Sequence, residues 1–278
     1  MLIHIGMHKT GSSWLQQRLF AAHSDFHALV GEGKHSENAI VRYLVTTPEE
    51  DYDPSKCLAL VKDAGVAGEK IPVLSAERLS GHPLSGGFDA AAIARKIYGT
   101  FPNAKILIVE RDPVDMVQSV YKQLVKEGAT FSVQEFLDYD AWKAPGPSPA
   151  IYRRGRIAAL YAQHYSSRQV LVLSFEDFVT KKHGFLERLA DFTGANLEEA
   201  LDISTAAQNP VNNSFSNRKY RAVRILNRIR KSEANPSGIF KYSVATSLRI
   251  GEVFQYLFSN TALISNKELK HLEKKLDC

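Results

Sequence analysis

Short apolar runs rich in β-branched residues alternate with helix-patterned stretches along the first two-thirds of the chain. The opening residues Met1–Ile3 begin one such run, and the others are "IPVLSAE" (71–77), "AKILIVERD" (104–112) and "RQVLVLSFED" (168–177). Residues with helical spacing lie between them, at about 87–99, 113–127 and 150–165. Alternating strands and helices predict an α/β fold with a mostly parallel central sheet and helices on both faces.

The chain of 278 residues, 44% of them hydrophobic, is long enough for one large domain. The stretch "AWKAPGPSP" (141–149) is typical of a surface loop, and 205–219 is a long, polar, Asn-rich loop. After residue 219 we expect only helix. We therefore predict a single domain over 1–278, with an α/β core (1–204) and a loop and helical C-terminal extension (205–278).

Composition excludes several classes of protein. The two cysteines, Cys57 and Cys278, are too few for a Cys-based metal site and argue against a disulfide framework. No stretch approaches the roughly 18–20 apolar residues of a membrane span, and no signal peptide opens the chain, so we expect a cytoplasmic protein. The net charge of +5 favours anionic ligands but is too small to indicate nucleic acid.

The stretch "HIGMHKTGSSWL" (4–15) follows the first strand and leads into a helix. Its glycines permit positive φ and close backbone approach, and helix N-terminal amides can then face an anion. Gly6 and Gly11 keep the spacing of a nucleoside triphosphate loop, but the lysine stands at Lys9 instead of directly after Gly11. With no later strand-end aspartate to hold magnesium, a triphosphate with Mg²⁺ fits poorly. The alternative is an ordinary glycine turn with an exposed lysine.

A second strand end, "IVERDPVDMVQSVY" (108–121), carries Arg111 at its carboxyl end and Ser119 about two turns into the next helix. A guanidinium and a hydroxyl placed in this way can converge on one phosphate. Alternatively, Arg111 pairs with Asp112 or Asp115, and Ser119 has no special role. Two anion sites in one chain predict a ligand with phosphates at both ends.

These motifs resemble those of the sulfotransferases that use 3′-phosphoadenosine 5′-phosphosulfate (PAPS). "KTGSSWL" is similar to their 5′-phosphosulfate loop, "RDPVDMVQSVY" to their 3′-phosphate motif, and "QVLVLSFEDFVTKKHGFLERLADFTG" (169–194) to their late strand and helix. The resemblance covers residues 1 to about 194 and implies a P-loop-like sulfotransferase fold of bacterial type. The aromatic-Pro-Lys lead-in of the cytosolic branch and its C-terminal basic motif are missing.

The resemblance implies a role for each motif residue. Lys9 would bridge the 5′-phosphate and the transferring sulfuryl group, and Arg111 and Ser119 would bind the 3′-phosphate. The Asn-rich loop would close over the cofactor through Asn213 and Arg218. The 5′-phosphate would be held by the other residues of the first loop, namely Thr10, Gly11, Ser12, Ser13 and Trp14. Transfer would be an in-line displacement that needs no metal, because lysine neutralises the leaving group.

The acceptor hydroxyl needs a base. Glu77, just past the second predicted strand, is the first candidate, and His82 is the nearest histidine; the family uses either residue type. Alternatively, Glu77 caps the following turn or pairs with Arg78.

The helix "RAVRILNRIRK" (221–231) places Arg221, Arg224, Arg228 and Lys231 on one face. This face is either solvated or a docking surface for an acidic glycan, an anionic lipid surface or the cofactor.

The leading interpretation is sulfation of a hydroxyl on a small molecule or a glycan, with carbohydrate favoured. Neither a nucleic acid partner nor a transmembrane segment is expected, peripheral membrane contact is left open, and the sequence does not give the oligomeric state. A P-loop kinase and a non-catalytic nucleotide-binding protein are the alternatives.

Overall fold

The structure is a computed structural model. It describes residues 1–7, 9–31, 37–66, 68–82, 85–138, 148–206, 217–232, 235–241, 243–254 and 264–276. The chain divides into two compact units. Met1–Asp112 and Arg154–Val211 form the first, and Pro113–Arg153 and Asn212–Cys278 form the second. Residues 113–153, which we expected in the α/β core, therefore group with the C-terminal segment.

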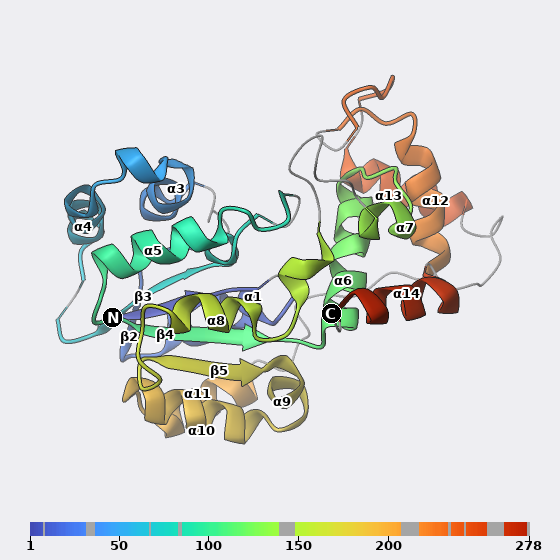
Figure 1. Ribbon diagram of the computed structural model, residues 1–278. Helices are drawn as coiled ribbons and strands as arrows, with labels where there is room; N and C mark the ends of the chain where they lie inside the picture. Colours follow the sequence, from blue (N-terminus) through green and yellow to red (C-terminus); the bar gives the residue numbers. More distant parts are fainter. Residues whose placement is uncertain are drawn as a thin grey trace. The chain divides into compact units, whose positions relative to one another are not determined.

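A five-stranded sheet forms the centre of the first unit, and all of its strands are parallel (Figure 1). The strand order is β2-β3-β1-β4-β5, with bounds β1 (Leu2–Ile5), β2 (Phe26–Ala28), β3 (Ile71–Ala76), β4 (Lys105–Glu110) and β5 (Val170–Ser174). Ile5 at the end of β1 is in register with Ala76 of β3 and with Ile108 of β4. The carboxyl ends of the three central strands therefore share one edge of the sheet. The predicted α/β class is confirmed.

Two details of the predicted strands are wrong. Residues 175–177 are the first turn of helix α9 (Phe175–Thr180) instead of strand, because the Ser174 side chain accepts the N–H groups of Glu176 and Asp177 and caps the helix. Strand β2 was not predicted at all, since three residues are too few to show an alternating pattern.

Helices cover both faces of the sheet. Their bounds in the first unit are α1 (Ser12–Trp14), a π-helical turn (Leu15–Leu19), α2 (Phe20–Ala22), α3 (Ala39–Thr46), α4 (Pro54–Asp63), α5 (Ala90–Thr100), α8 (Arg156–Ala162), α9, α10 (Lys182–Thr193) and α11 (Leu197–Ala206). Two 3₁₀ turns lie at Glu49–Asp51 and Glu77–Ser80. Helix α8 is shorter than the predicted 150–165, because Gly155 has φ 73° and interrupts the helix there.

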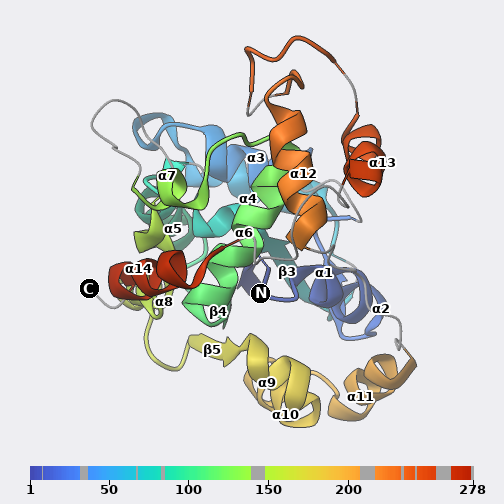
Figure 2. The ribbon, with the colours of Figure 1, turned by 90° about the vertical axis from the view of Figure 1, so that its right-hand side faces the viewer.

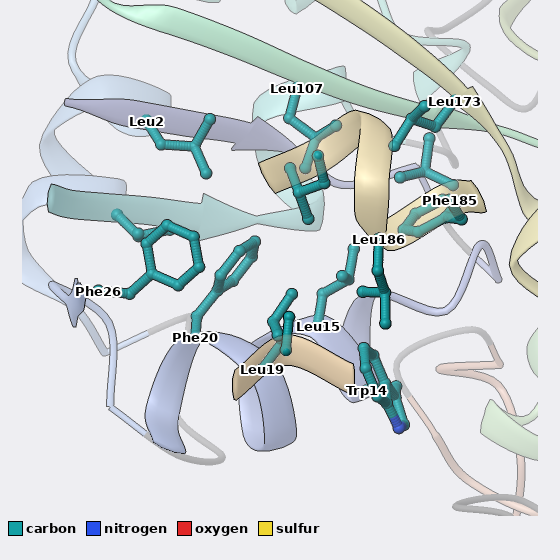
Figure 3. Close-up of a cluster of buried hydrophobic side chains, with 14 residues drawn as sticks. Leu2, Trp14, Leu15, Leu19, Phe20, Phe26, Leu107, Leu173, Phe185 and Leu186 are labelled. Atoms are coloured by element: carbon teal, nitrogen blue, oxygen red, sulfur yellow. The ribbon is translucent and has the colours of Figure 1, made fainter. Parts of the chain in front are cut away.

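A buried hydrophobic cluster ties the first loop to the sheet (Figure 3). Leu15 and Phe20, from the helical segment after the loop, point toward strand residues such as Leu107. Leu186 of α10 joins the same cluster from the side of β5. Both ends of the loop between β1 and α1 are thus anchored in the core.

The second unit is helical, with α6 (Pro113–Glu127), α7 (Val133–Leu137), a 3₁₀ turn (Pro149–Tyr152), α12 (Asn217–Asn227), α13 (Val244–Phe254) and α14 (Asn266–Leu276). Helix α6 has the predicted bounds of 113–127. Figure 2 shows α12 beside α6, where the buried Asn227 amide donates to the carbonyls of Val125 and Ala129.

The expectation of only helix after residue 219 agrees with α12, α13 and α14 but is wrong for the segment that follows α12. Helix α12 ends at Asn227, and Arg230 forms a bridge with Phe240. The Asn235 side chain donates to the carbonyl of Asn227 at 2.7 Å and so satisfies the helix end. Arg228 and Lys231 therefore lie beyond the helix whose basic face was predicted to include them.

Candidate active site

Three of the predicted site residues follow the carboxyl ends of adjacent strands. The loop with Lys9 follows β1, Glu77 follows β3, and Arg111 follows β4. Because β1 lies between β3 and β4, the topology brings these residues to one edge of the sheet. This is the edge at which open α/β sheets bind their ligands.

The first loop has a strained backbone and closely packed glycines. Lys9 has φ 66°, which is uncommon for a residue with a side chain, and Gly11 has φ 79° as the N-cap of α1. A Cβ on Gly6 would lie 3.2 Å from the Cα of Glu77 and 3.1 Å from the Ser12 hydroxyl. The loop therefore runs directly against the backbone of the candidate base, and a side chain at Gly6 would push the two apart.

Two of the loop hydroxyls brace the loop itself. The buried side chains of Thr10 and Ser12 donate to the Met7 carbonyl, at 2.7 and 3.3 Å. Ser13 is half-buried. The helix begins at Ser12, and the Trp14 N–H already donates to the Gly11 carbonyl at 2.9 Å. The N-terminal end of a helix favours an anion because of the helix dipole and its first N–H groups.

Trp14 was expected to contact the cofactor, and that expectation stays a prediction; its side chain packs into the core. It is only 7% exposed, its ring centroid lies 5.1 Å from that of Phe178, and the Lys182 ammonium lies 5.2 Å from its ring centre. The indole is part of the hydrophobic cluster in Figure 3 and holds the first turn of α1 against α9 and α10. Any contact of Trp14 with the cofactor would therefore be made through its backbone.

The Arg111 side chain links the two predicted anion sites. Its Nη1 atom donates to the Lys9 carbonyl at 3.1 Å, across 102 positions of the sequence. Its guanidinium carbon lies 5.0 Å from the centre of the Phe175 ring, within the range of a cation–π contact. Both cationic residues thus belong to one small region at the end of β1 and β4.

Helix α9 supports this region, and sequence reasoning missed it. Glu176 accepts the Asp112 N–H at 3.0 Å and the Ser174 hydroxyl at 2.6 Å, which fixes the turn directly after Arg111. Burial acts to raise the pKa of Glu176, but these two hydrogen bonds outweigh burial and lower that pKa below its ordinary value. The Glu176 carboxylate therefore holds the turn after β4 in place.

The same helix also fixes the position of the first loop. A Cβ on Gly11 would lie 3.3 Å from the Phe175 ring and 3.4 Å from the Phe178 ring. Phe175 and Phe178 lie three positions apart directly after a predicted strand. This spacing was the feature of the sequence from which the contact of α9 with the loop could have been predicted.

The candidate bases lie in a braced turn after β3. Glu77 is half-buried and begins the 3₁₀ turn Glu77–Ser80. Arg78 pairs with Asp89 at 2.8 Å, and Asp89 also accepts the His82 N–H at 2.9 Å. Burial acts to raise the pKa of Asp89, but the hydrogen bonds from His82 and Arg78 outweigh it and lower that pKa. His82 is half-buried and close to residues 83–84, which lie outside the described part.

The remaining predicted residues belong to the second unit. Ser119 is half-buried on α6, and its expected role at the 3′-phosphate stays a prediction. Asn213 lies outside the described residues. Arg218 lies in the first turn of α12, and its side chain is outside the described part.

Comparison with known proteins bears on the family. Residues 89–199 match the family model described as "Sulfotransferase family". This match supports a sulfotransferase family assignment. It therefore supports sulfotransfer as the general activity of the chain. The matched range includes Arg111 and Ser119, and it begins after Lys9 and Glu77.

Solved sulfotransferase structures resemble the chain. A crystal structure of a sulfotransferase from Alicyclobacillus acidocaldarius has a TM-score of 0.52 and 23% identity, covering 70% of this chain and 81% of that chain. At this identity the likeness shows the fold alone. The sulfotransferase domain from the curacin biosynthetic pathway has a TM-score of 0.45 and 15% identity, covering 100% of this chain and 97% of that chain. No curated protein matches the sequence significantly.

Two properties of the described residues bear on other predictions. Within the described ranges, no three His, Cys, Asp or Glu side chains are grouped so that they could hold a metal ion. The expectation that transfer needs no metal stays a prediction. None of the helices in the described part is long and apolar enough to cross a bilayer.

Proposed function

We propose that the chain transfers a sulfuryl group from PAPS to an acceptor hydroxyl, with a carbohydrate or glycoconjugate as the acceptor class. The observation that carries this proposal is the hydrogen bond of 3.1 Å from Arg111 Nη1 to the Lys9 carbonyl. It joins two cationic turns, from strand ends about a hundred residues apart in sequence, at one edge of the sheet. A ligand with an anion at each end of an adenosine suits such a pair.

Each residue has a proposed part. The first-turn amides after Gly11 bind the 5′-phosphate of PAPS, and the Lys9 ammonium lies between that phosphate and the sulfuryl group. Arg111, with Ser119, binds the 3′-phosphate through charge-assisted hydrogen bonds. Two features of the first loop support this assignment. Gly11, with φ 79°, lets the chain turn into α1, and the close packing of Gly6 against the Glu77 backbone holds the loop beside the candidate base.

Transfer itself is an in-line displacement. The acceptor oxygen forms a bond to sulfur while the bond from sulfur to the bridging phosphate oxygen breaks. The acceptor proton passes to Glu77, and 3′-phosphoadenosine 5′-phosphate (PAP) leaves. Lys9 neutralises the charge that grows on the leaving oxygen. His82 is the second candidate for the base. Glu77 is favoured because its backbone directly adjoins the loop that carries Lys9.

A binding experiment separates this function from a kinase. Isothermal titration should show that PAP binds and that ATP with Mg²⁺ does not. Arg111→Ala should weaken PAP binding about 10- to 100-fold, the loss expected for hydrogen bonds to a charged group. It should leave AMP, which lacks the 3′-phosphate, almost unaffected. Arg95→Ala is the matched control, because Arg95 is exposed on α5 and pairs with Glu49. Tight binding of ATP with Mg²⁺, or equal losses for PAP and AMP, would refute the assignment.

A transfer experiment separates an enzyme from a non-catalytic nucleotide-binding protein. With radiolabelled PAPS and a panel of saccharides and phenols, Glu77→Gln should reduce transfer about 10²- to 10⁴-fold and leave PAP affinity unchanged. Lys9→Ala should abolish transfer. If His82→Asn instead has the large effect, the base is His82. A protein that binds PAPS but shows no turnover with any acceptor, in wild type or variants, is a binding protein.

A further inference from the structure

The segment after α12 exposes apolar side chains on a closed turn of the second unit. The N–H groups of Ile239 and Phe240 both donate to the Ile229 carbonyl at 2.9 Å, and the Lys231 N–H donates to the Phe240 carbonyl at 2.8 Å. These bonds hold Ile239 and Phe240 beside the end of α12.

The apolar side chains of this turn and of the adjoining end of α12 are exposed to solvent. Ile239 is 77% exposed and Phe240 is 57% exposed. Ile225, in the last turn of α12, is 45% exposed, and Ile229, just beyond the helix, is 42% exposed. Single exposed apolar residues are common on protein surfaces, but four large ones on two bonded segments form a patch. We call these four residues the apolar tip.

Cationic side chains flank the apolar tip. Residues 217–241 contain eight Lys or Arg and one acidic residue, so this segment carries a charge of +7, against +5 for the whole chain. Part of this charge serves packing, since Arg230 is buried and donates to the Lys126 carbonyl, and Arg224 donates to the Tyr121 hydroxyl. Arg228, Lys231 and Lys241 are exposed next to the tip.

We propose that the apolar tip and its cationic flank dock on the surface of a bilayer that contains anionic phospholipid. Apolar side chains can enter the boundary between headgroups and acyl chains while exposed lysines and arginines contact the anionic headgroups. Binding of an acidic polymer would account for the exposed positive charge but not for the four exposed apolar side chains. A second copy of the chain would bring the same dense positive charge against this patch and be repelled. The docking is independent of the transfer reaction.

Vesicle sedimentation of the full-length protein tests the proposal. Vesicles of phosphatidylcholine with about 30% phosphatidylserine should sediment the protein, and vesicles of phosphatidylcholine alone should bind it much less. Raising the salt from about 0.1 M to about 1 M should release it, because screening shortens the reach of exposed charges.

Two variants with matched controls locate the surface. Lys231→Gln with Lys241→Gln should lower partitioning about fivefold for each lysine. Ile239→Ser with Phe240→Ser should lower it at least about tenfold through lost apolar burial. The controls lie on α4, where Lys56, Lys62 and Leu58 are exposed: Lys56→Gln with Lys62→Gln, and Leu58→Ser, should have no effect.

Several outcomes would overturn the proposal. These are equal binding to both kinds of vesicle, equal losses in the α4 controls, retention on heparin without vesicle binding, or a concentration-dependent dimer that the tip variants abolish. Because all substituted side chains are exposed, unchanged melting temperatures should accompany the losses in binding.

Discussion

Replacing Phe175 with leucine removes the aromatic ring against which the Arg111 guanidinium packs. The guanidinium carbon lies 5.0 Å from the ring centre, and both side chains are half-buried. A cation–π contact of this kind contributes about 1 kcal/mol, between the values for exposed and desolvated pairs. Leucine keeps an apolar contact but has no ring quadrupole. We therefore expect PAP affinity to fall about fivefold, with AMP affinity nearly unchanged.

The assay is isothermal titration of PAP and AMP into wild type, Phe175→Leu, Arg111→Ala and the double variant. If Phe175 acts by positioning Arg111, the double variant should lose no more PAP affinity than Arg111→Ala alone. The control is Phe178→Leu on the same helix, whose ring packs against Trp14 and Phe185. Its effect on the ratio of PAP to AMP affinity should be small.

Two outcomes would refute this reasoning. One is an equal loss of PAP and AMP affinity in Phe175→Leu, which would indicate general disturbance of the first loop. The other is additivity of the two substitutions within about 0.3–0.5 kcal/mol, the deviation found for independent sites.

Two further predictions concern stability. Gly11→Ala should lower the free energy of unfolding, measured by urea titration, by roughly 1–2 kcal/mol, because alanine is strained at φ 79°. The control is Gly99→Ala on α5, where a Cβ meets no neighbouring atom; it should leave the free energy of unfolding unchanged or raise it. In the second unit, the Lys275 ammonium and the His271 ring lower the pKa of Asp138 from 3.8 to about 2. A lowered carboxyl pKa stabilises the fold above about pH 4, and this contribution disappears as the pH falls toward 2. Asp138→Asn should therefore flatten the loss of stability over that range, and an unchanged slope would contradict this role.

Much of the first unit could be predicted from local patterns. Apolar β-branched runs marked β1, β3, β4 and β5, and Pro113 marked the start of α6. The edge shared by Lys9, Glu77 and Arg111 followed from parallel strands, because parallel strands end at the same side of a sheet. These predictions needed only periodicity and the chirality of crossover connections.

Other features depended on contacts that no local pattern encodes. The end of α12 is set by the Asn235 side chain, which reaches back to the carbonyl of Asn227. The Trp14 side chain lies within the loop motif, and its position depends on packing against Phe178 in the core. In both cases a partner outside the local motif fixes where the chain or the side chain lies.

The strand order explains why α9 belongs to the candidate site. Strand β5 pairs with β4, so the helix that follows β5 begins beside the turn that follows β4. The Glu176 carboxylate then holds the Asp112 N–H, and Phe175 lies against both Gly11 and the Arg111 guanidinium. The N–H donors of a guanidinium lie in its plane. The Phe175 ring covers one face of the Arg111 guanidinium, and one donor is used by the Lys9 carbonyl. Together these contacts fix the direction from which the remaining donors can bind a phosphate. On the proposed function, α9 thus sets the geometry of the 3′-phosphate site through residues that need not touch the ligand.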